Sequence, residues 1–326
     1  MRPHLFIFSF LLGGLGAFIA IKFAGKLGLI DIPNHRSSHA HITPKGGGIG
    51  VLAAFLLGSL MLQIPISLWL PSLVIALIGL WGGDKRCLSV KERLLIQFGC
   101  SLVFLVFFLY SKQVAAAGYL LCIPLSVFIV GTSNFYNFMD GIDGIAGVTG
   151  VVGFSLLGFH NRIFGTNDTY TTLSLILAFS CLGFLCFNFP KAKVFLGDLG
   201  SVLLGFVFAC LTIVLSETLV DFIVMVGFLA PFYFDELLTM VVRIKNQDDL
   251  TLAHRKHMYQ LLTNELGIRH WKVALGYGVA QLVIGGSVIF LKPGGLYFIL
   301  PAYLVYSLVF VWASRLIRRK VFVQCK

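Results

Sequence analysis

Residues 118–144 read GYLLCIPLSVFIVGTSNFYNFMDGIDG, an apolar run that ends in a cluster of amide and carboxylate side chains. The apolar part is long enough to form most of a membrane-spanning helix. A polar side chain then follows at every third residue: Asn134, Asn137, Asp140 and Asp143. On a helix this spacing places neighbours together, and the glycine after each aspartate predicts that the helix ends in a turn. Ionisable groups at the end of a span are costly, so these residues are functional-site candidates; ordinary capping of a hydrated helix end is the alternative.

Apolar runs of spanning length recur from one end of the chain to the other. Of the 326 residues, 58% are hydrophobic, and the mean hydropathy is +0.91. This composition excludes a soluble globular protein and predicts an all-α polytopic integral membrane protein. No soluble domain, internal repeat or low-complexity linker is visible, so residues 1–326 are expected to form a single domain. Eleven transmembrane helices are predicted, near residues 5–24, 47–63, 66–83, 94–111, 118–138, 145–160, 171–188, 196–216, 220–241, 273–291 and 295–314.

The distribution of positive charge predicts how these helices are oriented. Twenty-one of the 25 Lys and Arg residues fall in one set of alternate loops, and positive residues accumulate on the cytoplasmic side of a membrane. The N-terminus is therefore expected outside and the C-terminus in the cytoplasm. The net charge of +11 reflects this asymmetry and does not indicate a nucleic-acid partner. Eleven of the 14 acidic residues fall on the same side, so the chemistry is expected to face the cytoplasm.

A second acidic stretch, residues 188–201 (NFPKAKVFLGDLGS), strengthens the functional interpretation. Lys191 and Lys193 precede Asp198, which has glycines on both sides of it at positions 197 and 200. Mg²⁺ takes oxygen ligands in proteins, commonly one or two carboxylates together with substrate phosphates. Asp198 is therefore the strongest candidate for a metal ligand, with Mg²⁺ expected and Mn²⁺ as the alternative ion.

Three further loops on the same side carry basic residues suited to phosphate groups. In the first, Arg36 and Lys45 accompany three consecutive glycines, whose N–H groups can bind a phosphate before a helix; a flexible loop is the alternative. In the second, Asp84 lies among cations that include Arg93, as it would in a solvated charge cluster. In the last, residues 254–257 read HRKH, without the Glu of a zinc motif. Its cations can neutralise a diphosphate or, alternatively, bind anionic lipids.

Five of these segments, taken in order, resemble the polyprenyl-phosphate N-acetylhexosamine-1-phosphate transferases of bacterial glycosyltransferase family 4. This family includes the undecaprenyl-phosphate GlcNAc-1-phosphate transferases and the phospho-N-acetylmuramoyl-pentapeptide transferase. The segments that carry the resemblance are DIPNHRSSH and PKGG (residues 31–39 and 44–47), Asp84 with Arg93, NFYNFMDGIDG (134–144), KVFLGDLGS (193–201), and Pro231 with Asp235 through Arg243 to HRKH (254–257).

The resemblance implies an enzyme of the bacterial inner membrane. It implies transfer of a sugar 1-phosphate from a UDP-N-acetylhexosamine to undecaprenyl phosphate, with release of UMP. By position, Asp198 and Asn137 match the family's Mg²⁺ ligands, and Asp143 and Asn188 match its nucleotide region.

The resemblance also assigns the last loop, where Arg255 and His257 match the diphosphate and sugar region. The residues predicted to carry out the reaction are Asp84, Asp140, Asp143, Asp198 and His257. Those predicted to bind the substrates are Arg36, Lys45, Arg93, Asn134, Asn188, Lys193 and Arg255.

Two positions depart from the family's pattern. Gly83-Asp84 replaces the usual pair of aspartates, of which the first has been proposed as the base that deprotonates the lipid phosphate. Because most of a phosphate monoester is already a dianion at neutral pH, direct attack by the lipid phosphate is the working hypothesis, with Asp84 orienting the acceptor. Tyr259-Gln260 stands where several relatives carry further histidines. This form resembles the subgroup that primes surface polysaccharide or lipopolysaccharide O-antigen, with a 6-deoxy sugar as one candidate donor.

Other functions stay open at this point. A lipid or sugar transporter or flippase would keep ionisable groups near the middle of the bilayer, where none is obvious. A CDP-alcohol phosphotransferase would need Ala-Arg soon after Asp140-Gly, which this chain lacks. An inactive relative is compatible with Gly83. Gly-rich helix faces can pack within one chain or between copies, so a homodimer is also open.

Overall fold

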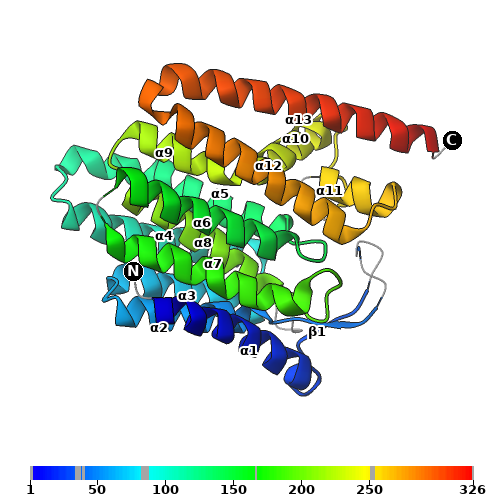
Figure 1. Ribbon diagram of the computed structural model, residues 1–326, viewed down its shortest axis with the longest axis horizontal. Helices are drawn as coiled ribbons and strands as arrows, with labels where there is room; N and C mark the ends of the chain where they lie inside the picture. The colour runs from blue at the N-terminus through cyan, green and yellow to red at the C-terminus, as the bar shows by residue number, and fades with distance from the viewer. Residues whose placement is uncertain are drawn as a thin grey trace.

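Long apolar helices run back and forth through the molecule, as the apolar runs predict (Figure 1). The computed structural model describes residues 3–33, 38, 41–81, 88–165, 167–249 and 254–324. The elements are α1 (Pro3–Leu27), β1 (Ile30–Asp31), β2 (Thr43–Pro44), α2 (Gly48–Met61), α3 (Ile66–Trp81), α4 (Val90–Ser111), η1 (Ala116–Leu121), α5 (Cys122–Phe138), α6 (Ile145–Phe164), α7 (Asp168–Asn188), α8 (Gly197–Leu215), α9 (Leu219–Val226), η2 (Gly227–Leu229), α10 (Ala230–Lys245), α11 (Met258–Gln260), η3 (Leu261–Glu265), α12 (His270–Leu291), η4 (Lys292–Gly294) and α13 (Leu296–Gln324).

The helix content confirms an all-α, multi-pass membrane protein. Each of the eleven segments predicted to span contains helix. Within the described residues, eight helical segments are long and apolar enough to cross a membrane. Two of the remaining helices, α2 and α3, have 14 and 16 residues, so they fall short of the roughly 20 residues of a full span. The count of eleven spans and the orientation of the termini therefore stay predictions, although Figure 1 places the two termini at opposite ends of the helices.

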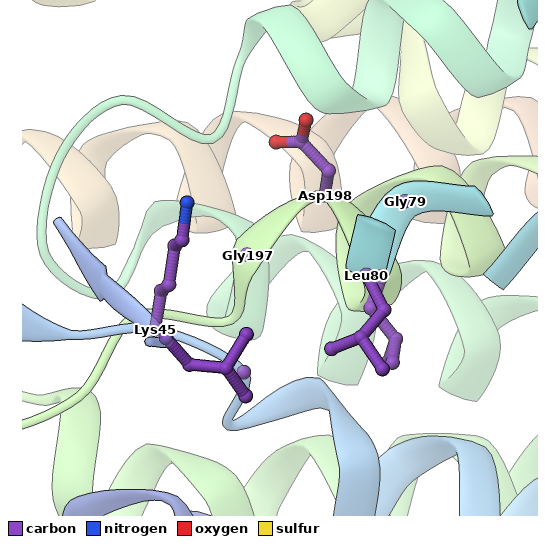
Figure 2. A pocket seen from close by; sticks show the side chains of 8 residues that line it. Lys45, Gly79, Leu80, Gly197 and Asp198 are labelled. Atoms are coloured by element: carbon purple, nitrogen blue, oxygen red, sulfur yellow. The ribbon is translucent and has the colours of Figure 1, made fainter. Parts of the chain in front are cut away.

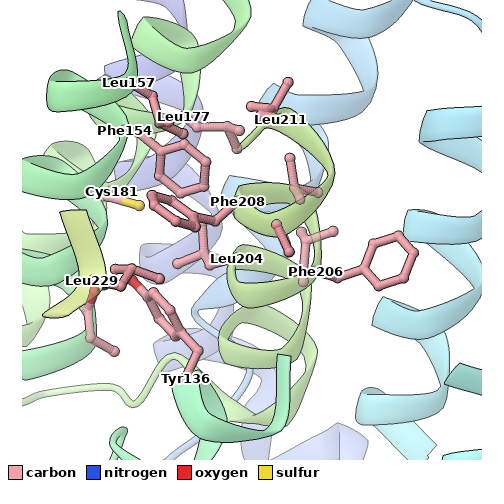
Figure 3. Packing of buried hydrophobic residues seen from close by; sticks show 14 of the residues in the cluster. Tyr136, Phe154, Leu157, Leu177, Cys181, Leu204, Phe206, Phe208, Leu211 and Leu229 are labelled. Carbon is pink, nitrogen blue, oxygen red and sulfur yellow. Dashed lines mark hydrogen bonds between the residues drawn. The ribbon is translucent and has the colours of Figure 1, made fainter. Parts of the chain in front are cut away.

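The central helix of the bundle is α8. It packs against α2, α3, α5, α6, α7 and α9. Of its most apolar stretch of 18 consecutive residues, 89% is buried inside the protein. Its apolar side chains point in every direction, as expected for a helix enclosed by others. In Figure 3, Phe208 lies beside Phe154 of α6, with ring centroids 5.8 Å apart, and Phe206 points to the opposite side. Helix α8 is consequently held in place by packing along most of its length.

The last helix, α13, has the opposite environment. It lies along the edge of the bundle (Figure 1). Only 6% of its most apolar stretch of 18 consecutive residues is buried inside the protein. Its large exposed side chains include Leu304, Leu308 and Trp312. In a membrane protein such a surface faces the lipid acyl chains, so α13 contributes little to the core.

Helices α1 and α7 approach each other through glycines. A Cβ added at Gly13 would overlap the backbone of Ser180, and one added at Gly183 would overlap the carbonyl oxygen of Phe10. Small residues at helix interfaces allow this close approach in lipid, where packing contributes more to association than the hydrophobic effect does.

We therefore expect Gly13→Ala to destabilise the protein, because the added methyl group meets backbone that cannot move aside. The expected loss is about 1–3 kcal/mol, seen as a lower thermal unfolding midpoint in detergent. Gly286→Ala is the matched control, since Gly286 is exposed on α12 and its added Cβ would meet nothing within 4 Å. Equal unfolding midpoints for the two variants would contradict this account of the α1–α7 contact.

Candidate active site

Asp198 lies in the first turn of the central helix, where the chain needs a glycine to enter it. Gly197 has a φ of 75°, in the left-handed region that other residues rarely adopt. The Asp198 side chain is 48% exposed, and its carboxylate benefits from the positive end of the helix dipole. Asn137, at the end of α5, donates from Nδ2 to Asp198 Oδ1 at 3.2 Å, and Arg93 Nη1 lies 4.0 Å from Asp198 Oδ2. Three segments far apart in the sequence therefore meet at this carboxylate.

Two cavities meet at Asp198. The first encloses about 330 Å³, part of it open to solvent, and Figure 2 shows the Lys45 ammonium and the Asp198 carboxylate extending to the same side of it. Gly79 lines this cavity and lets α3 approach closely, since a Cβ there would lie 2.7 Å from the Asp198 carbonyl carbon. The second cavity encloses about 370 Å³ and is lined by Ile75, Ile78, Gly79, Arg93, Gln97, Asn134, Asn137, Asp198 and Val202.

The glycine loop beside the first cavity differs from the phosphate-binding loop expected from the sequence. The N–H groups of Gly47 and Gly48 do not point to a phosphate site, because they donate to the carbonyl oxygens of Phe195 and Leu196 at 2.9 and 3.0 Å. These bonds continue the bridge between Lys45 and Phe195 and hold the glycine loop against the segment that enters α8. The glycines thus place the Lys45 side chain in the cavity, and that side chain is what remains available to an anion.

The second cavity combines an apolar wall with amide and guanidinium groups. Asn134 Nδ2 donates to Gln97 Oε1 at 2.7 Å and to the carbonyl oxygen of Val130 at 2.7 Å. Gln97 was not among the predicted site residues. The signal in the sequence was its spacing of four from Arg93, which places both side chains on one face of α4.

Asp140 stands near a second negative charge. Burial and the charge of Asp198 raise the pKa of the Asp140 carboxyl well above its usual range. A carboxyl group whose ionisation is disfavoured beside a neighbouring carboxylate is a setting in which a bound cation is stabilising.

The oxygen atoms here suit a magnesium ion that also binds phosphate. No cluster of three or more His, Cys, Asp or Glu side chains able to hold a metal occurs in the part of the chain that the structure describes. Asp198 with the Asn137 amide would supply two ligands, a set typical of Mg²⁺ bound jointly with substrate phosphates. Because Asn137 directs Nδ2 at Asp198, shared binding requires its amide to turn over and present Oδ1.

The two acidic stretches are joined by Asn188. Its Oδ1 accepts from the Gly144 N–H and its Nδ2 donates to the Val194 carbonyl oxygen, both at 2.8 Å. With both ends of this buried amide engaged, Asn188 fixes the turn after α5 to the loop before α8. In the same turn, Asp143 Oδ2 lies 3.2 Å from Nδ1 of His270, a residue that the sequence had not suggested.

His257 lies deep in the protein, in the segment that docks on α10. Its side chain is 4% exposed, and its Nε2 lies 3.5 Å from Glu236 Oε2. Burial, with the positive charges of Arg318 and Arg243, lowers the pKa of His257 to about 3. The imidazole is therefore neutral at physiological pH, and a contribution to diphosphate binding would come from hydrogen bonding and not from charge.

The remaining predicted residues differ in position. Lys193 is exposed on the loop that leads to Asp198, and Arg255 is half-buried beside His257. Arg36 and Asp84, together with Gly83, lie outside the described residues. The structure thus brings Asp198, Asn137, Arg93, Asn134 and Lys45 to two adjoining cavities, and the catalytic and binding roles of all these residues stay predictions.

Comparisons with known proteins find one family and several similar transferases. Residues 65–216, which contain Arg93, Asn137 and Asp198, match the family described as Glycosyl transferase family 4. A probable undecaprenyl-phosphate N-acetylglucosaminyl 1-phosphate transferase of Bacillus subtilis (strain 168) is 28% identical over 311 residues, covering 89% of this chain and 84% of that protein. A phospho-N-acetylmuramoyl-pentapeptide-transferase of Staphylococcus aureus (strain MSSA476) is 26% identical over 271 residues, covering 74% of this chain and 83% of that protein.

The lowered pKa of His257 predicts that acid destabilises the protein. Between pH 6.5 and about 3, the unfolded chain takes up a proton at this residue and the folded chain does not, so stability falls as the pH falls through that window. At about pH 5 the expected loss is about 2 kcal/mol, measured by thermal unfolding in detergent across a pH series. His257→Gln should flatten this dependence, and the same change at the exposed His41 should leave it as it is. Equal pH slopes in the wild type and His257→Gln would contradict the assignment.

Proposed function

We propose that this chain is a member of glycosyl transferase family 4, which its residues 65–216 match, and that it transfers an N-acetylhexosamine 1-phosphate from a UDP-sugar to undecaprenyl phosphate and releases UMP. The two relatives are named as transferases of this kind. The observation that carries the proposal is the position of Asp198, at the end of the central helix and between two cavities that differ in chemistry. The proposed location is the bacterial inner membrane.

The two cavities suggest separate routes for the two substrates. The first cavity is lined by leucines as well as by Lys45, and the Lys45 ammonium suits the diphosphate of a water-soluble donor arriving from the cytoplasm. Ile75, Ile78 and Val202 give the second cavity an apolar wall, and Arg93 adds a cation at its polar end. This combination suits an acceptor with a phosphate head and a prenyl chain. Asp198 would then lie where the two phosphate groups meet.

The reaction proposed is a direct displacement. An oxygen of the lipid phosphate attacks the β-phosphorus of the donor, a new P–O bond forms, and the bond from the β-phosphorus to the oxygen that bridges it to the α-phosphorus breaks, so that UMP leaves. Most of the lipid phosphate is a dianion at neutral pH and needs little help from a base. Lys45 and Arg93 would reduce the repulsion between the two phosphate groups. Asp84 would orient the acceptor.

We propose that the reaction depends on Mg²⁺, with Mn²⁺ as the alternative ion. Asp198 and Asn137 would hold the ion, and substrate phosphates would complete its ligands. When bound, it supplies positive charge that stabilises the phosphates in the transition state. Asp140, whose ionisation is disfavoured beside Asp198, would ionise more readily with the cation present.

The donor and the pathway are proposed from the segment HRKHMYQ, residues 254–260. Its resemblance to the O-antigen subgroup favours a UDP-N-acetylated hexosamine and the priming of lipopolysaccharide or another surface polysaccharide. Tyr259 is fully buried and donates to the carbonyl oxygen of Phe138 at 3.0 Å. Tyr259 would therefore influence sugar recognition through the position of the segment and not by touching the sugar.

The test is exchange of labelled UMP into a panel of UDP-N-acetylhexosamines by purified protein, with undecaprenyl phosphate and Mg²⁺. We expect exchange with one donor, its loss on chelation, and a decrease of at least about a hundredfold in Asp198→Asn, because charge stabilisation at the phosphates is removed. Asp168→Asn is the control, since Asp168 is exposed and pairs with Arg162 instead of lying at the site.

Two results would count against the transferase. Absence of exchange with every donor, from folded protein, would favour an inactive relative. Movement of undecaprenyl phosphate across vesicles without exchange would favour a transporter or flippase.

The role proposed for Asp84 makes a separate prediction. If the lipid phosphate attacks without a base, Asp84→Asn should raise the KM for undecaprenyl phosphate and leave the pH profile of kcat unchanged, because only orientation of the acceptor is lost. The measurement is transfer between about pH 6 and 9 at saturating donor. Loss of a pH-dependent step with acceptor binding intact would instead identify Asp84 as a base.

A further inference from the structure

The segment His254–Gln260 is fixed from a helix that otherwise contributes little to the core. Helix α13 runs along the edge of the bundle next to α10 and α12 (Figure 1). Near its C-terminal end, Arg318 turns inward, and its Nη2 donates to the carbonyl oxygen of Lys256 at 2.8 Å. The same nitrogen donates to Thr239 Oγ1 at 3.4 Å, and Nε donates to Ser314 Oγ at 3.2 Å. Thus the Arg318 side chain links α13 to the segment His254–Gln260.

The same segment is held from α10 by a buried carboxylate. Asp235 accepts from the N–H groups of Met258 and Tyr259 at 2.7 and 3.3 Å, and from the Tyr277 hydroxyl at 2.6 Å. Thr239, which accepts from Arg318, donates to Asp235 Oδ1 at 3.3 Å. Arg318 and Asp235 therefore belong to one network that fixes consecutive backbone groups of the segment, a carbonyl on one side and two N–H groups on the other.

This network also determines how the segment contacts the acidic turn after α5. Tyr259, whose N–H Asp235 accepts, donates its hydroxyl to the Phe138 carbonyl oxygen. A Cβ added at Gly141 would overlap that hydroxyl, so the segment and the turn are in direct contact. Asp140 and Asp143 lie in this turn. A displacement of the segment would therefore change its position relative to Asp140 and Asp143, two of the predicted catalytic residues.

We propose that Arg318 is a positioning residue for the nucleotide-sugar donor. It fixes the Lys256 carbonyl and so determines where Arg255, directly before it, stands relative to the acidic turn. This inference depends on the proposed function for its substrate, since Arg255 is assigned to the diphosphate and sugar region. Removal of the guanidinium leaves a partly buried carbonyl without its charged donor, and the segment then gains freedom to move.

The first test is independent of activity. Hydrogen–deuterium exchange of the intact protein in detergent should be at least about tenfold faster at Met258 and Tyr259 in Arg318→Leu than in the wild type. Arg318→Lys, which keeps a charged donor, should lie between the two. Arg319→Leu is the matched control, because Arg319 is the exposed neighbour on the same helix, and it should behave as the wild type. Unchanged exchange in Arg318→Leu, or equal acceleration in Arg319→Leu, would overturn the proposal.

The second test separates positioning from general stability. In the transfer assay we expect Arg318→Leu to raise the KM for the UDP-sugar about tenfold, with kcat and the KM for undecaprenyl phosphate changed little, and Arg318→Lys to recover most of the difference. A fall in kcat with unchanged KM would overturn the assignment to the donor.

The two tests also distinguish the inference from the function on which it depends. Wild-type protein that accepts no donor refutes the proposed transfer, while the exchange measurement still decides whether Arg318 fixes the segment. If Arg318→Leu does not fold, Arg318→Lys carries both tests, with exchange no faster than in the wild type, or no rise at all in the KM for the donor, as the contradicting results.

Discussion

The enclosure of α8 on every side is the constraint on which the candidate site depends. A helix surrounded by other helices cannot shift or rotate without disturbing all of them, because close-packed interiors transmit strain. Asp198 stands in its first turn, so the packing of the core determines where this carboxylate lies. Asn137 and Arg93 are then brought to it by helices that pack on α8 or on its neighbours.

Charge is balanced around this fixed point by groups from separate segments. Burial and the charge of Asp198 disfavour ionisation of Asp140, whereas Lys45 and Arg93 contribute positive charge to the adjoining cavities. Phosphate groups bring negative charge of their own, so a site for two phosphorylated substrates needs cations from outside the acidic cluster. The arrangement of acids at the centre and bases at the margins meets this need.

The sequence was sufficient to predict where helices form, but it was insufficient to predict the contacts between them. Apolar runs predicted all eleven helical segments, since the hydrophobic period and length are local properties. The meeting of Asn137 with Asp198 was reached only through the family resemblance. Gln97 and Arg318 escaped prediction because each acts through a partner remote in the chain, Asn134 and Lys256, and a single sequence carries no information about such pairs. The bonds from Gly47 and Gly48 to the loop before α8 were missed for the same reason.

Because α13 is poorly buried, the thickness of the bilayer can influence the geometry of the site. This helix has 29 residues, about 43 Å of α-helix, and its last turns carry Arg315, Arg318 and Arg319, so its charged end extends beyond a hydrocarbon core of about 30 Å. A helix with few protein contacts changes its tilt when the hydrocarbon core around its apolar part becomes thicker or thinner. Arg318 lies near the end of α13, where tilt produces the largest displacement, and it holds the segment beside the acidic turn. Lipids with longer or shorter chains would therefore act on this protein at a distance from any lipid-binding pocket, through the angle of its last helix.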